Sequence, residues 1–170
     1  TLGLSVELDL AVVREALAAL EAFPGRVAVN VSGRSIEDPR FEERVMKKLA
    51  RIGPGRLLVE LTETAEIEEL PPVAGRLARL RDVGVAVCLD DFRAGSASLR
   101  YLRDLPVDFV KIDGAYVRAA SSSQQGRAFI AAMQDLAAAK GAATIAEMIE
   151  TEAEAALMRE LGVGFGQGWL

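Results

Sequence analysis

The sequence predicts an α/β protein, and three observations support that fold class. Strand-like and helix-like segments alternate along the 170 residues, which implies right-handed crossovers and a parallel sheet covered by helices. The strand-like runs are almost continuously apolar, as in strands buried on both faces. No glycine-rich phosphate loop follows the first strand, which weakens a doubly wound nucleotide-binding sheet. Both architectures fit the alternation, and a TIM-type (β/α)8 barrel, here truncated to about six strands, is favoured.

The individual elements follow from apolar periodicity and from glycine or proline punctuation. A first helix is predicted from apolar residues at helical spacing, namely Leu10, Val13, Leu17 and Leu20. Further helices are predicted at about 39–52, 71–83 and 124–140, the last with an inner face of Phe129, Ile130, Met133, Leu136 and Ala137. A final helix is expected to turn inward Ala153, Ala156, Leu157 and Leu161. Strands are predicted at 26–31, 57–61, 85–89, 109–112, 142–146 and from 163 onward.

Composition excludes several classes of function. Twenty Lys and Arg against 25 Asp and Glu give a formal net charge of −5, so no basic stripe is available to bind a DNA or RNA polymer. The chain contains no histidine, which removes Ser-His-Asp and Cys-His catalysis and histidine-ligated zinc. Cys88, the single cysteine, lies in an apolar strand, and we expect a buried, inert thiol there. Carboxylates, lysine, amides and a hard metal ion remain as candidate catalytic groups.

Polar residues recur at the carboxyl ends of the predicted strands. They are Asn30, Glu60, Asp90 with Asp91, Lys111, Glu147 and Gln167. In a parallel barrel all strand carboxyl ends point to one face, so these side chains are predicted to converge although they are distant in sequence. Oxygen ligands without His or Cys suit Mg²⁺ or Mn²⁺ rather than zinc.

Each of these residues also has a simpler interpretation. Asn30 alone fits a turn or a helix cap, and a glutamate at a strand end, such as Glu60, is often solvated. Glu63 is assigned to the N-terminus of the following helix. Asp90 and Asp91 repel each other unless a cation joins them, and Lys111 between two apolar residues needs a charged partner. The recurrence at strand after strand favours a metal site.

Six segments resemble the EAL domain family in order and approximate spacing. They are Val29-Asn30-Val31-Ser32, Glu60-Leu61-Thr62-Glu63, Asp90-Asp91-Phe92, Val110-Lys111-Ile112-Asp113, Ala146-Glu147-Met148-Ile149-Glu150 and Gly166-Gln167-Gly168. The resemblance runs essentially from end to end, so residues 1–170 are expected to form a partial EAL domain. It implies a barrel that hydrolyses cyclic-di-GMP to the linear dinucleotide pGpG with two divalent cations, Mg²⁺ or Mn²⁺.

The resemblance also implies roles for individual residues. Metal ligands would be Asn30, Glu60, Asp90, Asp91, Glu147 and Gln167, with Asp90 bridging the two ions. Lys111 would hold or activate the attacking water and help to neutralise charge at the phosphorus. Glu150 would anchor the loop after Asp91. The catalytic group is therefore expected to be Lys111, Asp90 and Glu150.

Three departures from the family pattern stand out. The glutamate of the Glu-Ala-Leu motif is absent, because Glu15-Ala16-Leu17 lies in an amphipathic helix and is interpreted as a coincidence. The family's first two strands are expected to precede Thr1, and a full barrel needs roughly 200 residues or more. Arg93 and Ser96 replace the usual Gly and aromatic residue of the loop after Asp91, where an arginine adopts positive φ only with strain. Met148-Ile149 replaces the usual Gly-Val and is taken as the mildest change.

Three hypotheses remain open at this stage: a working phosphodiesterase, a non-enzymatic cyclic-di-GMP receptor, and a dimerisation platform without ligand. The resemblance implies a homodimer and fusion to sensor, cyclase or membrane domains. No apolar run reaches the roughly 20 residues of a membrane span, and no signal peptide opens the chain. A cytoplasmic location is therefore predicted. Residues 3–9 resemble a membrane-attached receptor subgroup, which suggests the cytoplasmic part of an anchored protein.

Overall fold

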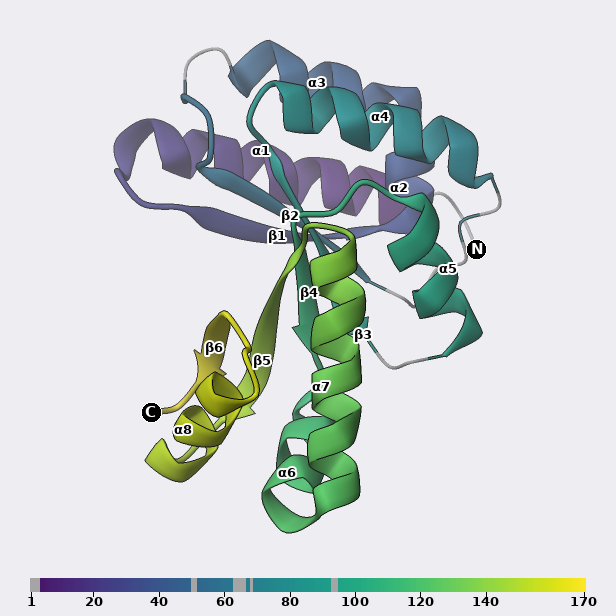
Figure 1. Cartoon of the computed structure of the whole chain (residues 1–170). Helices are drawn as coiled ribbons and strands as arrows, with labels where there is room; N and C mark the ends of the chain where they lie inside the picture. Colours follow the sequence, from purple (N-terminus) through teal and green to yellow (C-terminus); the bar gives the residue numbers. More distant parts are fainter. Residues whose placement is uncertain (1–3, 50–51, 63–66, 68, 93–94) are drawn as a thin grey trace. The chain divides into compact units, whose positions relative to one another are not determined.

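A computed structural model of the chain describes residues 4–49, 52–62, 67, 69–92 and 95–170 (Figure 1). Six strands lie within these residues: β1 (Val27–Ser32), β2 (Leu57–Thr62), β3 (Ala86–Phe92), β4 (Phe109–Ile112), β5 (Ala143–Ile149) and β6 (Phe165–Gly168). The helices of the same residues are α1 (Leu4–Ala22), α2 (Gly33–Glu37), α3 (Pro39–Leu49), α4 (Leu70–Asp82), α5 (Ser96–Asp104), α6 (Gly114–Ser122), α7 (Gln124–Ala139) and α8 (Glu152–Glu160).

The strands follow the order β1-β2-β3-β4-β5-β6, each beside its neighbour in sequence. The pairs β1–β2, β4–β5 and β5–β6 are parallel. A doubly wound sheet reverses its strand order at a switch point, and no reversal occurs here. The consecutive order is that of a barrel wound in one direction, so the favoured architecture is confirmed.

The chain divides into two compact units. The first comprises residues 1–88 and 104–106, and in it α1 packs on β1 (Figure 1). The predicted inner face of α1 is confirmed, because its four apolar residues are at most 2% exposed: Leu10, Val13, Leu17 and Leu20. Gly84 follows the end of α4 with φ of +90°, a conformation that glycine adopts without strain. Cys88 is fully buried, as expected.

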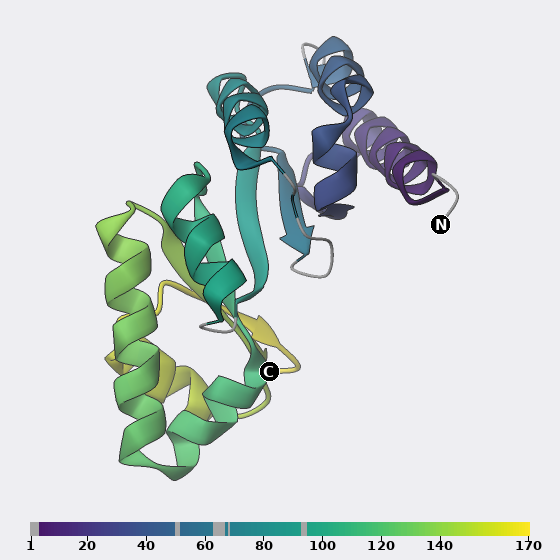
Figure 2. The same ribbon diagram turned by 90° about the vertical axis from the view of Figure 1, so that its right-hand side faces the viewer.

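The second unit comprises residues 89–103 and 107–170, and helices α6 and α7 lie side by side in it (Figure 2). Asp113 caps α6 by accepting a hydrogen bond from the Ala115 amide at 2.7 Å. Ser123 caps α7 in the same way, through the Gly126 amide at 3.0 Å. The Tyr116 and Phe129 rings stack across the pair with centroids 4.7 Å apart. The hairpin therefore holds the segment that follows β4 firmly against α7.

Several details of the predicted elements were wrong. Helices α2, α5 and α6 were not predicted, since each is short and rich in Ser, Gly or Ala. Leu136 is 45% exposed, so the inner face of α7 consists of Ile130, Met133 and Ala137. In α8 the buried residue is Met158, Leu157 and Leu161 are half-buried, and Ala153 and Ala156 are exposed. The inner face of α8 is thus turned by one residue, because small alanines occur on both faces and hide the true periodicity.

Strands β3 and β5 continue further than apolar periodicity indicates. β3 reaches Phe92 instead of ending at residue 89, and β5 reaches Ile149 instead of 146. Ladder pairing therefore extends into the polar residues at the strand ends. Among the described helices, none is long and apolar enough to cross a membrane.

Candidate metal centre

Three carboxylates meet at the carboxyl ends of β3 and β5 in the second unit. One oxygen each from Asp90, Asp91 and Glu147 lies within 4.8 Å of the others. Asp90 and Glu147 are half-buried, while Asp91 is exposed. The structure thus brings together three of the residues predicted to bind metal, although 56 positions separate Asp91 from Glu147.

Lys111 of β4 lies between two of these carboxylates. Its Nζ is 2.9 Å from Asp90 Oδ1 and 2.7 Å from Glu147 Oε1. The residue is only 5% exposed, and its neighbours Val110 and Ile112 are buried. A buried ammonium is costly unless it is paired. The predicted charged partner of Lys111 is therefore present, and it is a pair of carboxylates.

The backbone turns left-handed directly after each of the two carboxylates that contact Lys111. Asp91 has φ of +52° and Met148 has φ of +54°, and they are the non-glycine residues with positive φ in the described chain. The pairing of β5 with β6 also shifts its register between Ala146 and Ile149, so a β-bulge or similar irregularity lies at residues 147–148. Bulges re-aim side chains and are frequent beside active sites. The local backbone accordingly points Glu147 toward Lys111.

Met148 occupies this strained position with help from α6. Asp and Asn visit the left-handed region readily, whereas methionine does so at a cost. A side chain at Gly114, the first residue of α6, would meet the Met148 Cβ at 2.6 Å, so glycine there leaves room for the methionine. The Arg118 guanidinium lies 3.7 Å from Met148 Sδ. The Gly-to-Met departure therefore falls on a position that favours glycine, and its rank as the mildest change stays a prediction because Arg93 lies outside the described residues.

Asn30 and Glu60 lie on neighbouring strands of the first unit. They are direct partners in the parallel register of β1 and β2, so their Cα atoms are side by side. Glu60 is 9% exposed, which contradicts the simpler interpretation of a solvated strand-end glutamate. Asn30 is exposed. Their ligand roles stay predictions.

The remaining predicted site residues are placed as follows. Gln167 lies on β6 with an exposed side chain, and Glu150 follows β5 and is also exposed. The Glu150 amide donates a hydrogen bond to Glu154 Oε2 at 3.0 Å, so its backbone belongs to the cap of α8. Ser96 begins α5 rather than lying in a loop. Glu63 and Arg93 lie outside the described residues.

The donor set fits a hard divalent cation. Among the described residues, three carboxylates gather here and Lys111 is the cation shown to pair with them. Carboxylate oxygens without nitrogen or sulfur donors are the ligands of Mg²⁺ and Mn²⁺. These residues could hold such an ion at the edge of the sheet, beside the Lys111 ammonium.

Fold and site together define a parallel α/β barrel-type protein with a carboxylate centre at its strand ends. The family model described as EAL domain matches residues 1–170. The chain belongs to the EAL domain family. The Glu15-Ala16-Leu17 segment lies within helix α1, as predicted.

Curated relatives share the family and differ in length. The chain is 34% identical over 166 residues to the cyclic di-GMP phosphodiesterase PA2567 of Pseudomonas aeruginosa, covering 94% of this chain and 28% of that protein. It is 30% identical over 175 residues to the cyclic di-GMP phosphodiesterase PdeA of Borreliella burgdorferi, covering 99% of this chain and 26% of that protein. The chain thus spans about a quarter of the length of these two relatives.

Solved structures confirm the fold. The EAL enzyme Bd1971, in its cAMP and cyclic-di-GMP bound form, superposes with a TM-score of 0.86 at 25% identity, covering 99% of this chain and 49% of that one. The MucR phosphodiesterase in complex with c-di-GMP gives a TM-score of 0.83 at 28% identity, covering 98% of this chain and 70% of that one. The predicted fold class is therefore that of known EAL domains.

Proposed function

We propose that this EAL domain hydrolyses cyclic-di-GMP to pGpG with two divalent cations, Mg²⁺ or Mn²⁺. One observation carries the proposal: Asp90, Asp91 and Glu147 gather around the buried Lys111 at the strand ends. The curated relatives named above are called cyclic di-GMP phosphodiesterases, and two neighbouring structures have that nucleotide bound. These comparisons support the substrate.

The ligand set of the proposal is Asn30, Glu60, Asp90, Asp91, Glu147 and Gln167, with Asp90 between the two ions. Each of these residues stands at or beside the carboxyl end of a strand. Bound cations would polarise the phosphate and stabilise both the attacking and the leaving oxygen of an in-line displacement. The absence of histidine fits this chemistry, because a metal site needs no imidazole base.

In addition to the metal ligands, Lys111 is proposed to act on the reacting atoms. Its contacts with Asp90 and Glu147 hold the ammonium beside the cluster of three carboxylates. From there it would hydrogen-bond the attacking water and attract negative charge that develops on the phosphate oxygens. Glu150 would support the segment after Asp91, as the family resemblance implies.

A second function, a cyclic-di-GMP receptor with little or no turnover, is favoured by Met148. This residue holds φ of +54° directly beside Glu147, where relief of strain would move the carboxylate. Metal catalysis tolerates only small displacements of its ligands. A receptor needs the binding surface but not that precision.

The deciding experiment measures pGpG produced from cyclic-di-GMP by the full-length protein with Mg²⁺ or Mn²⁺. Turnover by the wild type that disappears in Asp90→Asn supports the phosphodiesterase. Tight binding of cyclic-di-GMP without turnover supports the receptor, and neither binding nor turnover would sink both.

The assembly belongs to the proposal as well. We propose a homodimer, and attached sensor, cyclase or membrane domains in the full protein, with the EAL domain on the cytoplasmic side. The relatives are about four times as long as this chain, which leaves ample length for other domains. Light scattering of the purified full-length protein tests whether it is a homodimer.

A further inference from the structure

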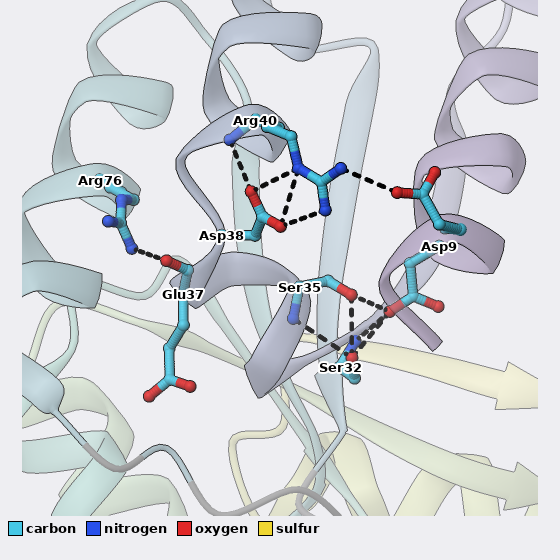
Figure 3. A network of polar contacts seen from close by, with 8 residues as sticks. Asp9, Ser32, Ser35, Glu37, Asp38, Arg40 and Arg76 are labelled. Atoms are coloured by element: carbon cyan, nitrogen blue, oxygen red, sulfur yellow. Dashed lines mark hydrogen bonds and ion pairs between the residues drawn. The ribbon is translucent and has the colours of Figure 1, made fainter. Parts of the chain in front are cut away.

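Asp9 of α1 binds the end of strand β1 through a single oxygen (Figure 3). Its Oδ2 accepts hydrogen bonds from the Ser32 amide at 2.9 Å, the Ser32 hydroxyl at 2.8 Å and the Ser35 hydroxyl at 2.6 Å. Ser35 is fully buried, and Asp9 and Ser32 are half-buried. A carboxylate that accepts three hydrogen bonds makes stronger contacts than a neutral acceptor would. Helix α1 is therefore tied to a point 23 residues further along the chain.

The segment that Asp9 holds joins β1 to the short helix α2. Ser32 ends β1 and caps α2, accepting a hydrogen bond from the Ser35 amide at 3.4 Å. Five residues are too few for a helix to be stable by itself. The other end of α2 is held by Arg76, whose Nη1 donates to the carbonyls of Ile36 at 3.1 Å and Glu37 at 2.5 Å. These two side chains hold α2, one at each end, in addition to the packing of its buried Ile36.

Asn30 stands two residues before Ser32 on the same strand. It is in register with Glu60, and Ser32 is in register with Thr62. Asn30 is exposed at this edge. Beyond Asn30, β1 is held by its pairing with β2 and, at Ser32, by two of the hydrogen bonds to Asp9.

We propose that Asp9 is a positioning residue for the metal ligand Asn30, acting through Ser32 and the β1–α2 turn. This inference rests on the proposed function, in which Asn30 holds a divalent cation. Partners behind a ligand orient it, and their loss typically lowers metal affinity 10- to 100-fold. Asp9 acts one step further away, so we expect a loss of about tenfold, at the lower end of that range.

Glu7, two residues before Asp9 on the same helix, provides a matched control. Glu7 of α1 pairs with Arg40 Nη1 at 2.9 Å. Arg40 also binds Asp38 at 2.7 Å (Figure 3). Side chains of Arg40 and Glu7 are more than half exposed, and exposed pairs contribute little. Glu7→Ala removes a carboxylate of α1 and a tether to residue 40 while leaving Ser32 and Ser35 bound to Asp9.

The test measures Mn²⁺ binding to the full-length protein by calorimetry and by electron paramagnetic resonance of free Mn²⁺. We expect Asp9→Ala to weaken Mn²⁺ binding about tenfold and Glu7→Ala to leave it unchanged. Asp9→Asn keeps an oxygen acceptor without the charge, so its loss should be smaller than that of Asp9→Ala. In turnover, the Mn²⁺ concentration for half-maximal rate should rise in Asp9→Ala by more than the KM for cyclic-di-GMP does.

The outcomes separate the two proposals. Wild type that binds no Mn²⁺ overturns the metal site and, with it, this inference. Wild type that binds Mn²⁺ while Asp9→Ala binds equally well overturns the inference alone. If Asp9→Ala does not fold, Ser35→Ala and Asp9→Asn decide. Ser35→Ala removes one of the three hydrogen bonds to Asp9 and leaves the two from Ser32. Asp9→Asn weakens all three without removing the acceptor oxygen. Wild-type Mn²⁺ affinity in both of those variants would contradict the role of Asp9.

Discussion

Lys111 Nζ lies 2.7 Å from Glu147 Oε1, and both side chains are largely buried at the strand ends. The same ammonium is 2.9 Å from Asp90 Oδ1. The lysine of β4 is therefore bracketed by carboxylates of β3 and β5. It supplies positive charge between two groups that would otherwise repel each other, and it stands where the reacting phosphate is proposed to bind.

Replacing Lys111 by Met tests both consequences. The loss of one partner from a buried ionic group costs about 3 kcal/mol, so the free energy of unfolding measured without metal should fall by about that amount. Added Mn²⁺ should stabilise Lys111→Met more than it stabilises the wild type, since the cation replaces the missing charge. Hydrolysis of cyclic-di-GMP should fall at least about a hundredfold. Urea unfolding with and without Mn²⁺, together with pGpG assays, measures these effects.

Lys47→Met is the matched control for that substitution. Lys47 pairs with Glu43 at 2.6 Å on the exposed face of α3, with side chains 72% and 64% exposed. Its replacement should change stability by less than about 0.5 kcal/mol and leave turnover intact. Equal destabilisation by the two substitutions would contradict the account of Lys111 as a buried bridge.

Asp91 is expected to serve the site with its charge and with its backbone. Asn tolerates the left-handed conformation found at φ of +52°, whereas Ala does not. Asp91→Asn and Asp91→Ala should both weaken Mn²⁺ binding, because both lack the carboxylate. Asp91→Ala should in addition be less stable than Asp91→Asn by about 1 kcal/mol.

Calorimetry with Mn²⁺ and urea unfolding of the Asp91 variants give the two readouts. Asp135→Asn, on an exposed part of α7, is a control for the loss of one negative charge. Identical stability of the Asn and Ala variants at position 91 would rule out the backbone role.

The sequence predicted the part of this site that depends on strand order. Apolar strands with polar ends, in a parallel sheet, are enough to bring Asp90, Lys111 and Glu147 to one edge. The buried pairing of Lys111 followed from its apolar neighbours, because an unpaired ammonium is costly there. These predictions needed no knowledge of side-chain packing.

The sequence could not predict what depends on local backbone geometry. The register shift between Ala146 and Ile149 and the positive φ of Met148 are local features, which periodicity does not determine. The contact of Asp9 with β1 was not predicted, because Asp9 is one of several polar residues beside the apolar stripe of α1. Its spacing of four from Val13 was the available signal, since residues four apart share a helix face.

The cap of α8 predicts a specific dependence of stability on pH. Hydrogen bonds from the Glu150 amide, then from Thr151, lower the pKa of Glu154 below its ordinary value of 4.5, and burial opposes this only partly. A carboxyl with a lowered folded-state pKa contributes stability above its unfolded pKa and loses it as the pH falls through the folded one. Glu154→Gln should therefore lower the stability at pH 7, where the carboxylate contributes, and its difference from the wild type should shrink as the pH falls below about 4.5.

Thr151→Ala separates the cap from the charge in that experiment. It removes the acceptor for the Glu154 amide, at 3.2 Å, and should cost about 1 kcal/mol, a loss that persists in acid where Glu154 is protonated. Urea unfolding across the acid range measures both variants. A Glu154→Gln curve parallel to that of the wild type would show that Glu154 does not titrate with folding.

Met148 gives a test of whether the strained backbone limits the metal site. Glycine at this position adopts φ of +54° without the penalty that a Cβ brings, whereas alanine keeps that penalty. Both replacements lose the contact with Arg118 and the packing on Gly114, so their difference isolates the backbone. Met148→Gly should be more stable than Met148→Ala by about 1 kcal/mol.

The same pair of variants bears on the choice between enzyme and receptor. If strain beside Glu147 restricts turnover, Met148→Gly should raise the kcat for cyclic-di-GMP while Met148→Ala does not. If the methionine is already accommodated by the room at Gly114, kcat should be equal in wild type and Met148→Gly, and the receptor hypothesis loses the observation that favours it.

Gly114→Ala is the complementary change: its new Cβ should collide with Met148 in the wild type and be tolerated beside Met148→Gly. A double-mutant cycle over these two positions measures that coupling, and additive effects would mean that Gly114 does not make room for Met148.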